Sequence, residues 1–346
     1  MKTIVLTGGG TAGHCLPHFA LLDELKKHFD KIYYIGSKTG IEKTLVLQKN
    51  IPYLEISTVK LKRSLSAQNA LIPFKLIKSV KEAKRILKKI RPNVVFSKGG
   101  FVGLPVTIAS KQLKIPVIIH ESDLSIGLAN KIASRFSVAT LTSFEQTATK
   151  IKNGRHVGCP IREELFVKNR RESLKVFNFS GNKPVLLVIG GSLGAKSINV
   201  LIENCLDDLL KQFDVLHVVG KGNLNGVLKK GYFQTEFTEM ANAYAVCDIA
   251  LSRAGANTLF ELLALKIPTL CIPLPKTQSR GDQIENAEYF MKKGYIKSIS
   301  QAGLTANILC REIYKLYNEK EKILSKLNAV DFKNSNKKII EILTKY

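Results

Sequence analysis

The sequence lacks the long hydrophobic run that a membrane-spanning helix requires. No apolar stretch approaches the roughly 18 residues that such a helix needs. The apolar core at the start, residues 4–6, is too short for the hydrophobic region of a signal peptide. The six cysteines form no C-x-x-C pair and no dense framework, which favours a reducing compartment. We therefore expect a soluble globular protein of the cytoplasm.

Acidic residues are scarce in this chain relative to basic ones. Lysine and arginine number 53 and aspartate and glutamate 28, which gives a formal net charge of +25. An excess of this size predicts an anionic partner: a nucleic acid, a membrane surface or a phosphorylated substrate. The alternative is a lysine-rich surface that only contacts solvent. The position of the charge along the chain distinguishes an anionic partner from such a surface.

Strand-like and helix-like segments alternate along most of the 346 residues. A strand predicted at 3–7 precedes a helical pattern at 17–29, and the same order restarts after a strand near 184–189. Parallel strands joined by crossover helices produce this order. The length and the restart therefore predict two similar α/β domains, each with a doubly wound parallel sheet.

Turn residues near position 158 mark the predicted domain boundary. We place the first domain at residues 1–158 and the second at 159–332. The tail at 333–346 has the apolar spacing of an amphipathic helix, which is expected to pack back on one of the two domains.

Four segments place small residues between a predicted strand and a helix, at 8–13, 99–103, 190–194 and 254–256. Glycine permits a close backbone approach, and the helix start behind it offers free N–H groups to a diphosphate. The pattern G-x-G-x-x-G alone occurs in many unrelated proteins. The second strand ends without the acidic residue of a nicotinamide site, and no G-x-x-x-x-G-K-[ST] sequence is present. A dehydrogenase and a P-loop nucleotidase are therefore disfavoured.

Three polar residues close to these loops are candidates for a reaction site. His14 directly follows the first loop. It is equally consistent with a general base and with a histidine that only forms local hydrogen bonds at the start of a helix. Glu261 lies one to two turns into the helix after the fourth loop and suits a ribose, although a solvated glutamate is the simpler interpretation. The amide of Gln283 both donates and accepts, which suits sugar hydroxyls.

Six motifs occur in the order found in one known family and cover nearly the whole chain. They are G-G-G-T-A-G-H (8–14), S-K-G-G-F-V-G-L-P (97–105), H-E-S-D-x-x-x-G-L-A-N-K (120–131), G-G-S-L-G-A-K (190–196), R-A-G-A-N-T-x-x-E (253–261) and S-R-G-D-Q-I-x-N-A (279–287). With them the sequence closely resembles the MurG family, the UDP-N-acetylglucosamine:N-acetylmuramyl-(pentapeptide) pyrophosphoryl-undecaprenol N-acetylglucosamine transferases of bacterial peptidoglycan synthesis. The resemblance implies a GT-B fold, two Rossmann-like domains facing a cleft, with the donor mainly on the C-terminal domain and the lipid acceptor on the N-terminal one.

The resemblance also implies which residues bind UDP-GlcNAc. Ser192 and the helix start after the fourth loop would hold the diphosphate, Glu261 the ribose and Gln283 the GlcNAc hydroxyls, with Thr238 at the uracil. The implied donor contacts are Thr11, Ala12, Gly13, Arg162, Ser192, Thr238, Ala256, Asn257, Thr258, Glu261 and Gln283. Together with these matches, His14 is favoured as the catalytic base.

Asp123 departs from the family's pattern, because some members carry asparagine at this position. A carboxylate accepts hydrogen bonds from sugar hydroxyls but cannot donate them. Three roles for Asp123 therefore stay open: a contact with GlcNAc, a contact with the acceptor, or a role in the structure of the loop alone. No D-x-D motif is present to hold a metal ion on the diphosphate, so we expect neither a bound metal nor another cofactor.

The segment 60–91 carries eleven basic residues and one acidic residue, a net +10 of the total +25. Some of its apolar residues recur at the spacing of a buried helical face. Further apolar residues fall outside this spacing and lie next to lysines in the sequence. The residues predicted to form a membrane patch are Phe74, Lys75, Ile77, Lys78 and Lys81. An apolar tip ringed by lysines suits an anionic bilayer surface, whereas no recognised motif or aromatic series supports nucleic acid. A solvated lysine-rich helix is the alternative.

The sequence thus predicts an inverting transferase that moves GlcNAc from UDP-GlcNAc to the 4-hydroxyl of undecaprenyl-pyrophosphoryl-MurNAc-pentapeptide. The partners are these two substrates and an anionic membrane surface, without nucleic acid, and the location is the cytoplasmic face of the cell membrane. Three alternatives stay open: another GT-B lipid glycosyltransferase, a UDP-GlcNAc epimerase and a non-catalytic subunit that binds nucleotide sugars.

Overall fold

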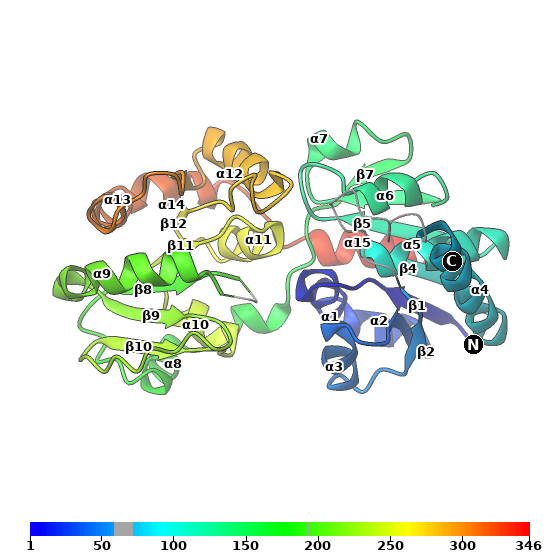
Figure 1. The fold of residues 1–346 in the computed structure, drawn as a ribbon, viewed down its shortest axis with the longest axis horizontal. Coiled ribbons are helices and arrows are strands. Elements are labelled where there is room, and N and C mark those ends of the chain that lie inside the picture. The colour runs from blue at the N-terminus through cyan, green and yellow to red at the C-terminus, as the bar shows by residue number, and fades with distance from the viewer. Residues whose placement is uncertain (59–71, 192–193) are drawn as a thin grey trace. The chain divides into compact units, whose positions relative to one another are not determined.

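The computed structural model describes residues 1–58, 72–191 and 194–346, with the backbone alone for Ala12 and Ile72. The chain forms two compact units (Figure 1). The first unit comprises Met1–Arg162 with Asn334–Tyr346, and the second comprises Glu163–Lys333. The first unit thus extends beyond the boundary at 158 that the sequence suggested. Arg162 accordingly belongs to the first unit, whereas the sequence analysis placed it in the second domain.

The first unit is built around seven parallel strands in the order β3-β2-β1-β4-β5-β6-β7. The strands are β1 (Thr3–Thr7), β2 (Lys31–Ser37), β3 (Tyr53–Ile56), β4 (Val94–Ser97), β5 (Val117–Glu121), β6 (Ala139–Thr142) and β7 (Gly154–His156). The helices are η1 (Ala12–His14), α1 (Leu16–Phe19), α2 (Leu22–His28), α3 (Ile41–Leu47), α4 (Ile72–Ile90), α5 (Gly100–Gln112), α6 (Leu128–Ala133), α7 (Glu145–Ala148) and α15 (Ser335–Leu343).

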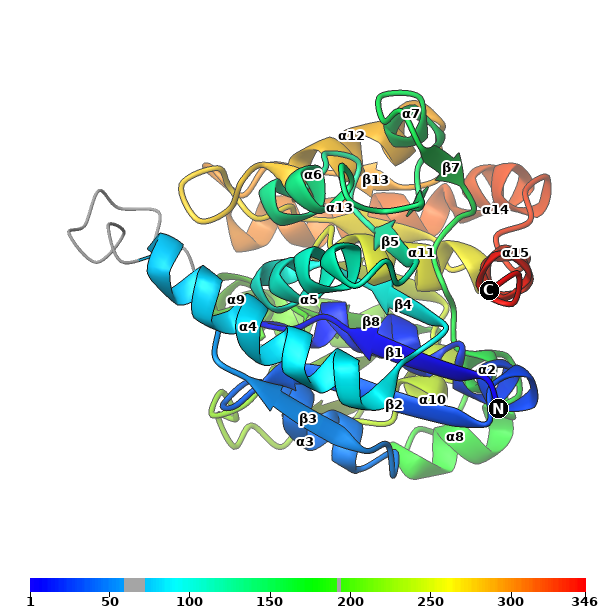
Figure 2. The ribbon, with the colours of Figure 1, turned by 90° about the vertical axis from the view of Figure 1, so that its right-hand side faces the viewer.

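Alternating side chains of β1 explain why helices cover both faces of this sheet. Ile4 and Leu6 are buried in one hydrophobic cluster, and Val5 is buried in another on the opposite face. Helices α4 and α5 supply buried residues to the cluster around Val5 and lie side by side along the sheet (Figure 2). A sheet buried on both faces requires the continuous hydrophobic strands seen here.

The C-terminal helix α15 completes the core of the first unit. Ile339, Ile340 and Leu343 are buried in the same cluster as Ile4 of β1. The side chain of Asn336 accepts a hydrogen bond from the Ile161 backbone N–H (3.0 Å) and donates to the Ile161 carbonyl (2.7 Å). The end of the chain is therefore held in the first unit by apolar packing and by a buried polar contact.

The second unit has six parallel strands in the order β10-β9-β8-β11-β12-β13. The strands are β8 (Val185–Ile189), β9 (Asp214–Val218), β10 (Tyr232–Thr235), β11 (Ile249–Ser252), β12 (Thr269–Cys271) and β13 (Lys297–Ser298). The helices are η3 (Glu163–Phe166), α8 (Arg170–Val176), α9 (Lys196–Gln212), α10 (Met240–Val246), α11 (Ala256–Ala264), α12 (Asp282–Lys292), α13 (Ala306–Asn318) and α14 (Lys320–Asn328).

Both sheets reverse their strand order at a central pair of strands. The chain moves outward from β1 to β2 and β3 and then returns to place β4 on the other side of β1, and β8 and β11 have the same relation in the second unit. Ligands of open α/β sheets bind beyond the carboxyl ends of such a pair. The loops that follow β1, β4, β8 and β11 are therefore where each unit presents a binding site.

Candidate active site

A pocket of about 540 Å³ lies in the second unit, at the carboxyl ends of β8 and β11. Its lining residues are Gly190, Gly191, Gly194, Ala195, Lys196, Ser197, Arg253, Leu274, Gln278 and Gln283. Among these residues, all from the described part of the chain, two are basic and none is acidic. A pocket with a glycine loop, a helix start and two cationic side chains is suited to a diphosphate.

Arg253, the first residue after β11, brings a buried positive charge to this pocket. Its side chain is 7% exposed, and burial lowers the pKa of its guanidinium. The guanidinium donates hydrogen bonds to the Ile272 carbonyl (2.9 Å) and to the Ser197 hydroxyl (2.9 Å). Both acceptors are neutral, so they fix the position of the charge without cancelling it.

Gln283 is the predicted sugar-binding residue that the structure places in the pocket wall. Its Oε1 atom accepts a hydrogen bond from the Leu274 backbone N–H (3.0 Å), and this bond fixes the orientation of the amide. The NH₂ group then points the other way and serves as a donor. An amide oxygen has two lone pairs, so the contact in which this residue both donates to and accepts from sugar hydroxyls stays a prediction.

Of the predicted donor contacts in the described part of the second unit, Gln283 lines this pocket, whereas Thr238, Glu261 and the three at the start of α11 are not among its lining residues. Ala256, Asn257 and Thr258 form the first turn of α11, as the sequence suggested. On the next turn, Glu261 Oε2 accepts a hydrogen bond from the Tyr244 hydroxyl (3.0 Å), which holds the carboxylate in place. Thr238 is partly buried in the segment that follows β10. Ser192 lies outside the described residues.

In the first unit, a buried carboxylate supports the glycine loop that follows β1. Glu42 is fully buried, and its Oε2 atom accepts a hydrogen bond from the Gly10 backbone N–H (3.3 Å). Its Oε1 atom accepts from the backbone N–H (3.2 Å) and the hydroxyl (2.5 Å) of Ser37. A Cβ atom on Gly9 would lie 2.4 Å from this oxygen, so the close approach requires glycine.

His14, the predicted base, ends the short helix η1 behind this loop, with Gly13 before it. Its Nδ1 atom lies 2.9 Å from the Thr11 hydroxyl. When Nδ1–H donates to this hydroxyl, the lone pair is on Nε2, which is the tautomer that a base needs. The structure thus brings Thr11 and His14 together, in an arrangement where the threonine orients the imidazole.

A buried basic side chain also follows β4. Lys98 is 3% exposed, and its Nζ atom donates hydrogen bonds to His120 Nδ1 (2.5 Å) and to the Ser122 hydroxyl (2.7 Å). The loop behind His120 is held from its other side by Glu121, whose carboxylate accepts from the backbone N–H groups of Asp123 (3.1 Å) and Gly127 (3.0 Å). Asp123 is therefore fixed through its backbone.

Sequence reasoning assigned no role to Glu42, Lys98 or Arg253, although the last two lie inside quoted motifs. A signal for those two was present. Each is the first residue after the second central strand of its sheet, so a comparison of the two halves of the sequence would have aligned them. Glu42 gave no such signal, because it lies on an ordinary amphipathic helix and its burial depends on the tertiary fold.

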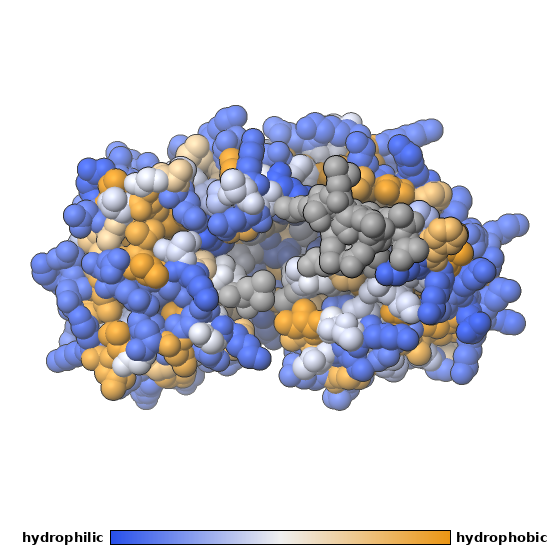
Figure 3. Space-filling model, in the orientation of Figure 1, coloured by the Kyte–Doolittle hydropathy of each residue, from blue (hydrophilic) through white to orange (hydrophobic). Residues whose placement is uncertain are grey.

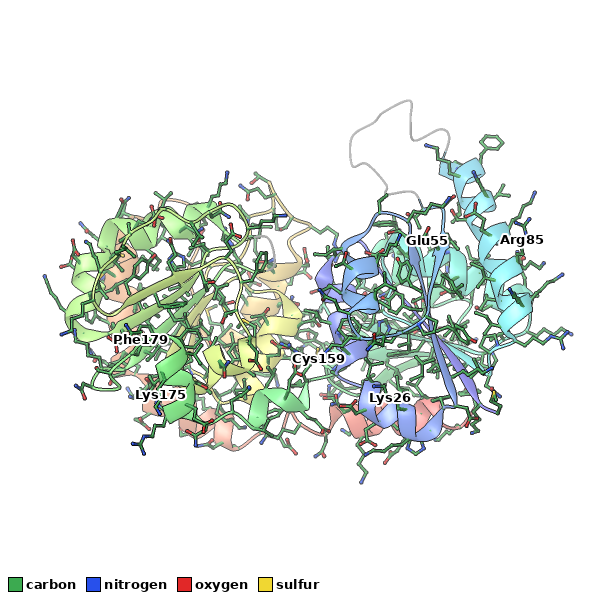
Figure 4. All side chains as sticks on the ribbon, turned by 90° about the horizontal axis from the view of Figure 1, so that it is seen from below. Lys26, Glu55, Arg85, Cys159, Lys175 and Phe179 are labelled. Carbon is green, nitrogen blue, oxygen red and sulfur yellow. The ribbon has the colours of Figure 1, made fainter. Side chains whose placement is uncertain are left out.

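The predicted membrane patch lies at the start of α4 on the first unit. Phe74 and Ile77 are 71% and 52% exposed. In Figure 3 a small hydrophobic area bordered by hydrophilic residues lies where Figure 1 labels α4. Farther along the helix, the labelled Arg85 extends away from the sheet (Figure 4), while Ala83 and Leu87 are buried against it. No helix of the described residues is long and apolar enough to cross a bilayer.

Two family models match the chain, the glycosyltransferase family 28 N-terminal domain over residues 4–142 and the C-terminal domain over residues 185–343. The chain is 44% identical to the UDP-N-acetylglucosamine--N-acetylmuramyl-(pentapeptide) pyrophosphoryl-undecaprenol N-acetylglucosamine transferase of Clostridium tetani, over 100% of this chain and 98% of that one. It is 46% identical to the protein of the same name from Clostridium perfringens, over 99% and 98% of the two chains.

Solved structures agree on the fold. MurG of Acinetobacter baumannii matches with a TM-score of 0.76 at 23% identity, over 100% of both chains. A UDP-GlcNAc 2-epimerase from Neisseria meningitidis matches with a TM-score of 0.67 at 17% identity, also over 100% of both. The GT-B fold therefore does not separate a transferase from an epimerase, but the full-length sequence identity does. The chain belongs to glycosyltransferase family 28 and, within it, to the MurG family of N-acetylglucosamine transferases.

Proposed function

We propose that the protein transfers GlcNAc from UDP-GlcNAc to the 4-hydroxyl of undecaprenyl-pyrophosphoryl-MurNAc-pentapeptide. The observation that carries this proposal is the identity of 44% and 46% to transferases of that name over essentially the whole chain. The pocket of the second unit supports it, because its buried Arg253 and its glycine loop suit the diphosphate of a nucleotide sugar.

In this mechanism the second unit binds the donor and stabilises its leaving group. Arg253 and Lys196 offset the negative charge that develops on UDP when the bond between the sugar carbon and the diphosphate oxygen breaks. The N–H groups at the start of α11 add partial positive charge. The amide NH₂ of Gln283 donates to a GlcNAc hydroxyl, and Glu261 accepts from the ribose.

The attacking 4-hydroxyl loses its proton to a general base, for which we propose His14. The Thr11 hydroxyl lies 2.9 Å from Nδ1, and in the tautomer whose Nδ1–H donates to it the lone pair on Nε2 takes the proton. Attack from the face opposite the departing UDP inverts the configuration at the sugar carbon. General bases of this kind contribute about 10²–10⁴ in rate, so His14→Ala should lower turnover by that factor.

The test is UDP release from UDP-GlcNAc with and without a short-chain lipid-pyrophosphoryl-MurNAc-pentapeptide. Release that depends on the acceptor, falls in His14→Ala and Gln283→Ala, and survives in the control His28→Ala supports the proposal. His28 is exposed at the end of α2, so its loss changes one histidine without touching the site. Turnover without acceptor would indicate an epimerase or hydrolase. Tight donor binding without turnover would indicate a binding subunit or a different acceptor.

We further propose that the start of α4 attaches the protein to the anionic face of the membrane where the lipid acceptor resides. Phe74 and Ile77 are exposed apolar side chains, and the neighbouring lysines at 75, 78 and 81 are exposed as well. Each lysine near an anionic surface contributes about 1 kcal/mol.

Sedimentation with phosphatidylglycerol vesicles tests this attachment. The double substitution Phe74→Ser and Ile77→Ser should weaken binding at both low and high salt, whereas replacing the three lysines should weaken it mainly at low salt. Unchanged binding in both variants would mean that another surface of the protein contacts the membrane. As a control, turnover with a short-chain soluble acceptor should stay normal in both variants.

A further inference from the structure

Lys98 lies at the central point of the sheet in the first unit. Its backbone N–H donates to the Thr7 carbonyl (2.9 Å), which joins the ends of β4 and β1. A Cβ atom on Gly8 would lie 3.2 Å from Lys98 Cβ, so the lysine packs directly against the first glycine loop. It is thus the counterpart of Arg253, which follows β11 in the second unit.

The two basic residues differ in what their charged groups contact. Arg253 lines an open pocket, whereas the Lys98 ammonium donates to His120 and Ser122 in the loop that follows β5. His120 Nε2 lies 2.8 Å from the Gly158 carbonyl, so this nitrogen carries the proton and Nδ1 accepts from Lys98. Lys98 therefore selects the tautomer of His120.

The surroundings of Lys98 determine when it is charged. Burial lowers the pKa of its ammonium to about 8, against the opposing effect of Cys159, Glu121 and Asp123. The imidazoles of His18 and His120 also interact with it, and burial followed by this positive charge lowers the pKa of both well below the usual range. At neutral pH the lysine is consequently the cation of the cluster and both histidines are neutral.

We propose that Lys98, in its ammonium form, is a positioning residue for the acceptor sugar, and that it acts through His120 and Ser122. This inference rests on the proposed function. Lys98 fixes the near end of the loop 122–127, and Glu121 fixes the rest. Ser122 and Asp123 in this loop are both partly buried, and a hydroxyl and a carboxylate are groups suited to the hydroxyls of a neutral sugar. The ordered loop lowers the conformational cost of binding this ligand.

The experiment compares initial rates of wild type, Lys98→Met, Lys98→Arg and the control Lys111→Met between pH 6.5 and 9.5, with donor and acceptor varied in turn. Methionine keeps the volume of the stem but removes the charge and both hydrogen bonds. Lys111 is an exposed lysine of α5 in the same unit. Because hydrogen bonds from a charged donor are lost, the acceptor KM of Lys98→Met at pH 7 should be about 10-fold or more above that of wild type. The donor KM should stay within about twofold of the wild-type value.

The pH profile separates positioning from a merely structural role. In wild type the acceptor KM should rise with pH through about 8, as Lys98 loses its proton, and approach the value of Lys98→Met. In Lys98→Met it should be flat over that range. Lys98→Arg should recover part of the affinity and lose the rise near pH 8, because arginine stays charged.

An acceptor KM in Lys98→Met that equals that of wild type, or that keeps the rise near pH 8, would overturn the inference while leaving the proposed function intact. A wild type without acceptor-dependent turnover would overturn both. If Lys98→Met does not fold, as judged by circular dichroism, Ser122→Ala provides the same comparison. It removes one of the two contacts and should raise the acceptor KM by a smaller factor, and an unchanged value there would equally count against the inference.

Discussion

Substitution of Glu42 by glutamine should destabilise the first unit and slow turnover, although the side chain keeps its shape. One carboxylate oxygen accepts two hydrogen bonds from Ser37 and the other accepts one from the Gly10 N–H. A glutamine has a single oxygen. Once this oxygen takes the two bonds from Ser37, the NH₂ group faces the N–H of Gly10, and two donors oppose each other in a fully buried site.

The cost follows from this mismatch. A lost hydrogen bond to a buried charged acceptor, with a donor left unpaired, amounts to about 1–3 kcal/mol. For a unit of this size each kcal/mol shifts the melting temperature by about 2–4 °C. The glycine loop that carries Thr11 and His14 rests on this contact, so we expect kcat to fall roughly 10-fold as the base is misplaced by part of an ångström.

Thermal unfolding by circular dichroism and initial rates of UDP release measure the two effects. UDP affinity, measured by calorimetry, should change less than kcat, because the pocket that suits a diphosphate lies in the second unit. Glu341→Gln is the matched control, since Glu341 is an exposed glutamate of α15 in the first unit. A Glu42→Gln protein with the melting temperature and kcat of the control would refute the argument that this carboxylate supports the loop.

Three further perturbations have expected outcomes. Arg253→Met should raise the donor KM about 10–100-fold while the acceptor KM stays near its wild-type value, as measured by initial rates. Asn336→Ala removes the contacts with Ile161 that hold α15, and should lower the free energy of unfolding by about 2–3 kcal/mol in urea titrations. Lys98 has a lower pKa when folded than the usual 10.5, so the unfolded chain binds more protons between about pH 8 and 10.5. Wild type should therefore gain up to about 3 kcal/mol relative to Lys98→Met across that window, seen as a rise of the wild-type urea midpoint relative to that of the variant.

The first strand of each sheet could be predicted because it is a short apolar run that is followed directly by a glycine. The strand predicted at 3–7 coincides with β1, and the one at 184–189 with β8. The helix pattern at 17–29 was wrong in detail, because the chain breaks after Phe19 and forms α1 and α2. The break places the His18 ring edge-on against Tyr34 and Phe96, a tertiary contact that helical spacing does not encode.

Residues of the candidate site could be predicted from the sequence where they lie in a recognisable motif. Gln283 was singled out from its loop, and the structure places it in the pocket wall, while its contact with the sugar stays a prediction. The groups that hold the site in place were not found, because their importance depends on burial. Glu42 and Lys98 have the composition of surface residues, and only the packing of α3 and β4 against the glycine loop makes them interior ones.

The two glycine loops look alike in sequence but present different chemistry. In the second unit the loop after β8 lines a pocket with Lys196 and Arg253, and no acidic residue is among the described lining residues. In the first unit the Gly10 N–H is already engaged by the Glu42 carboxylate, whose negative charge beneath the loop disfavours an anion. The cation there, Lys98, faces loop side chains instead of an open pocket. A diphosphate is therefore better matched to the pocket of the second unit than to the glycine loop of the first unit, in keeping with the place that the proposed function gives to the donor.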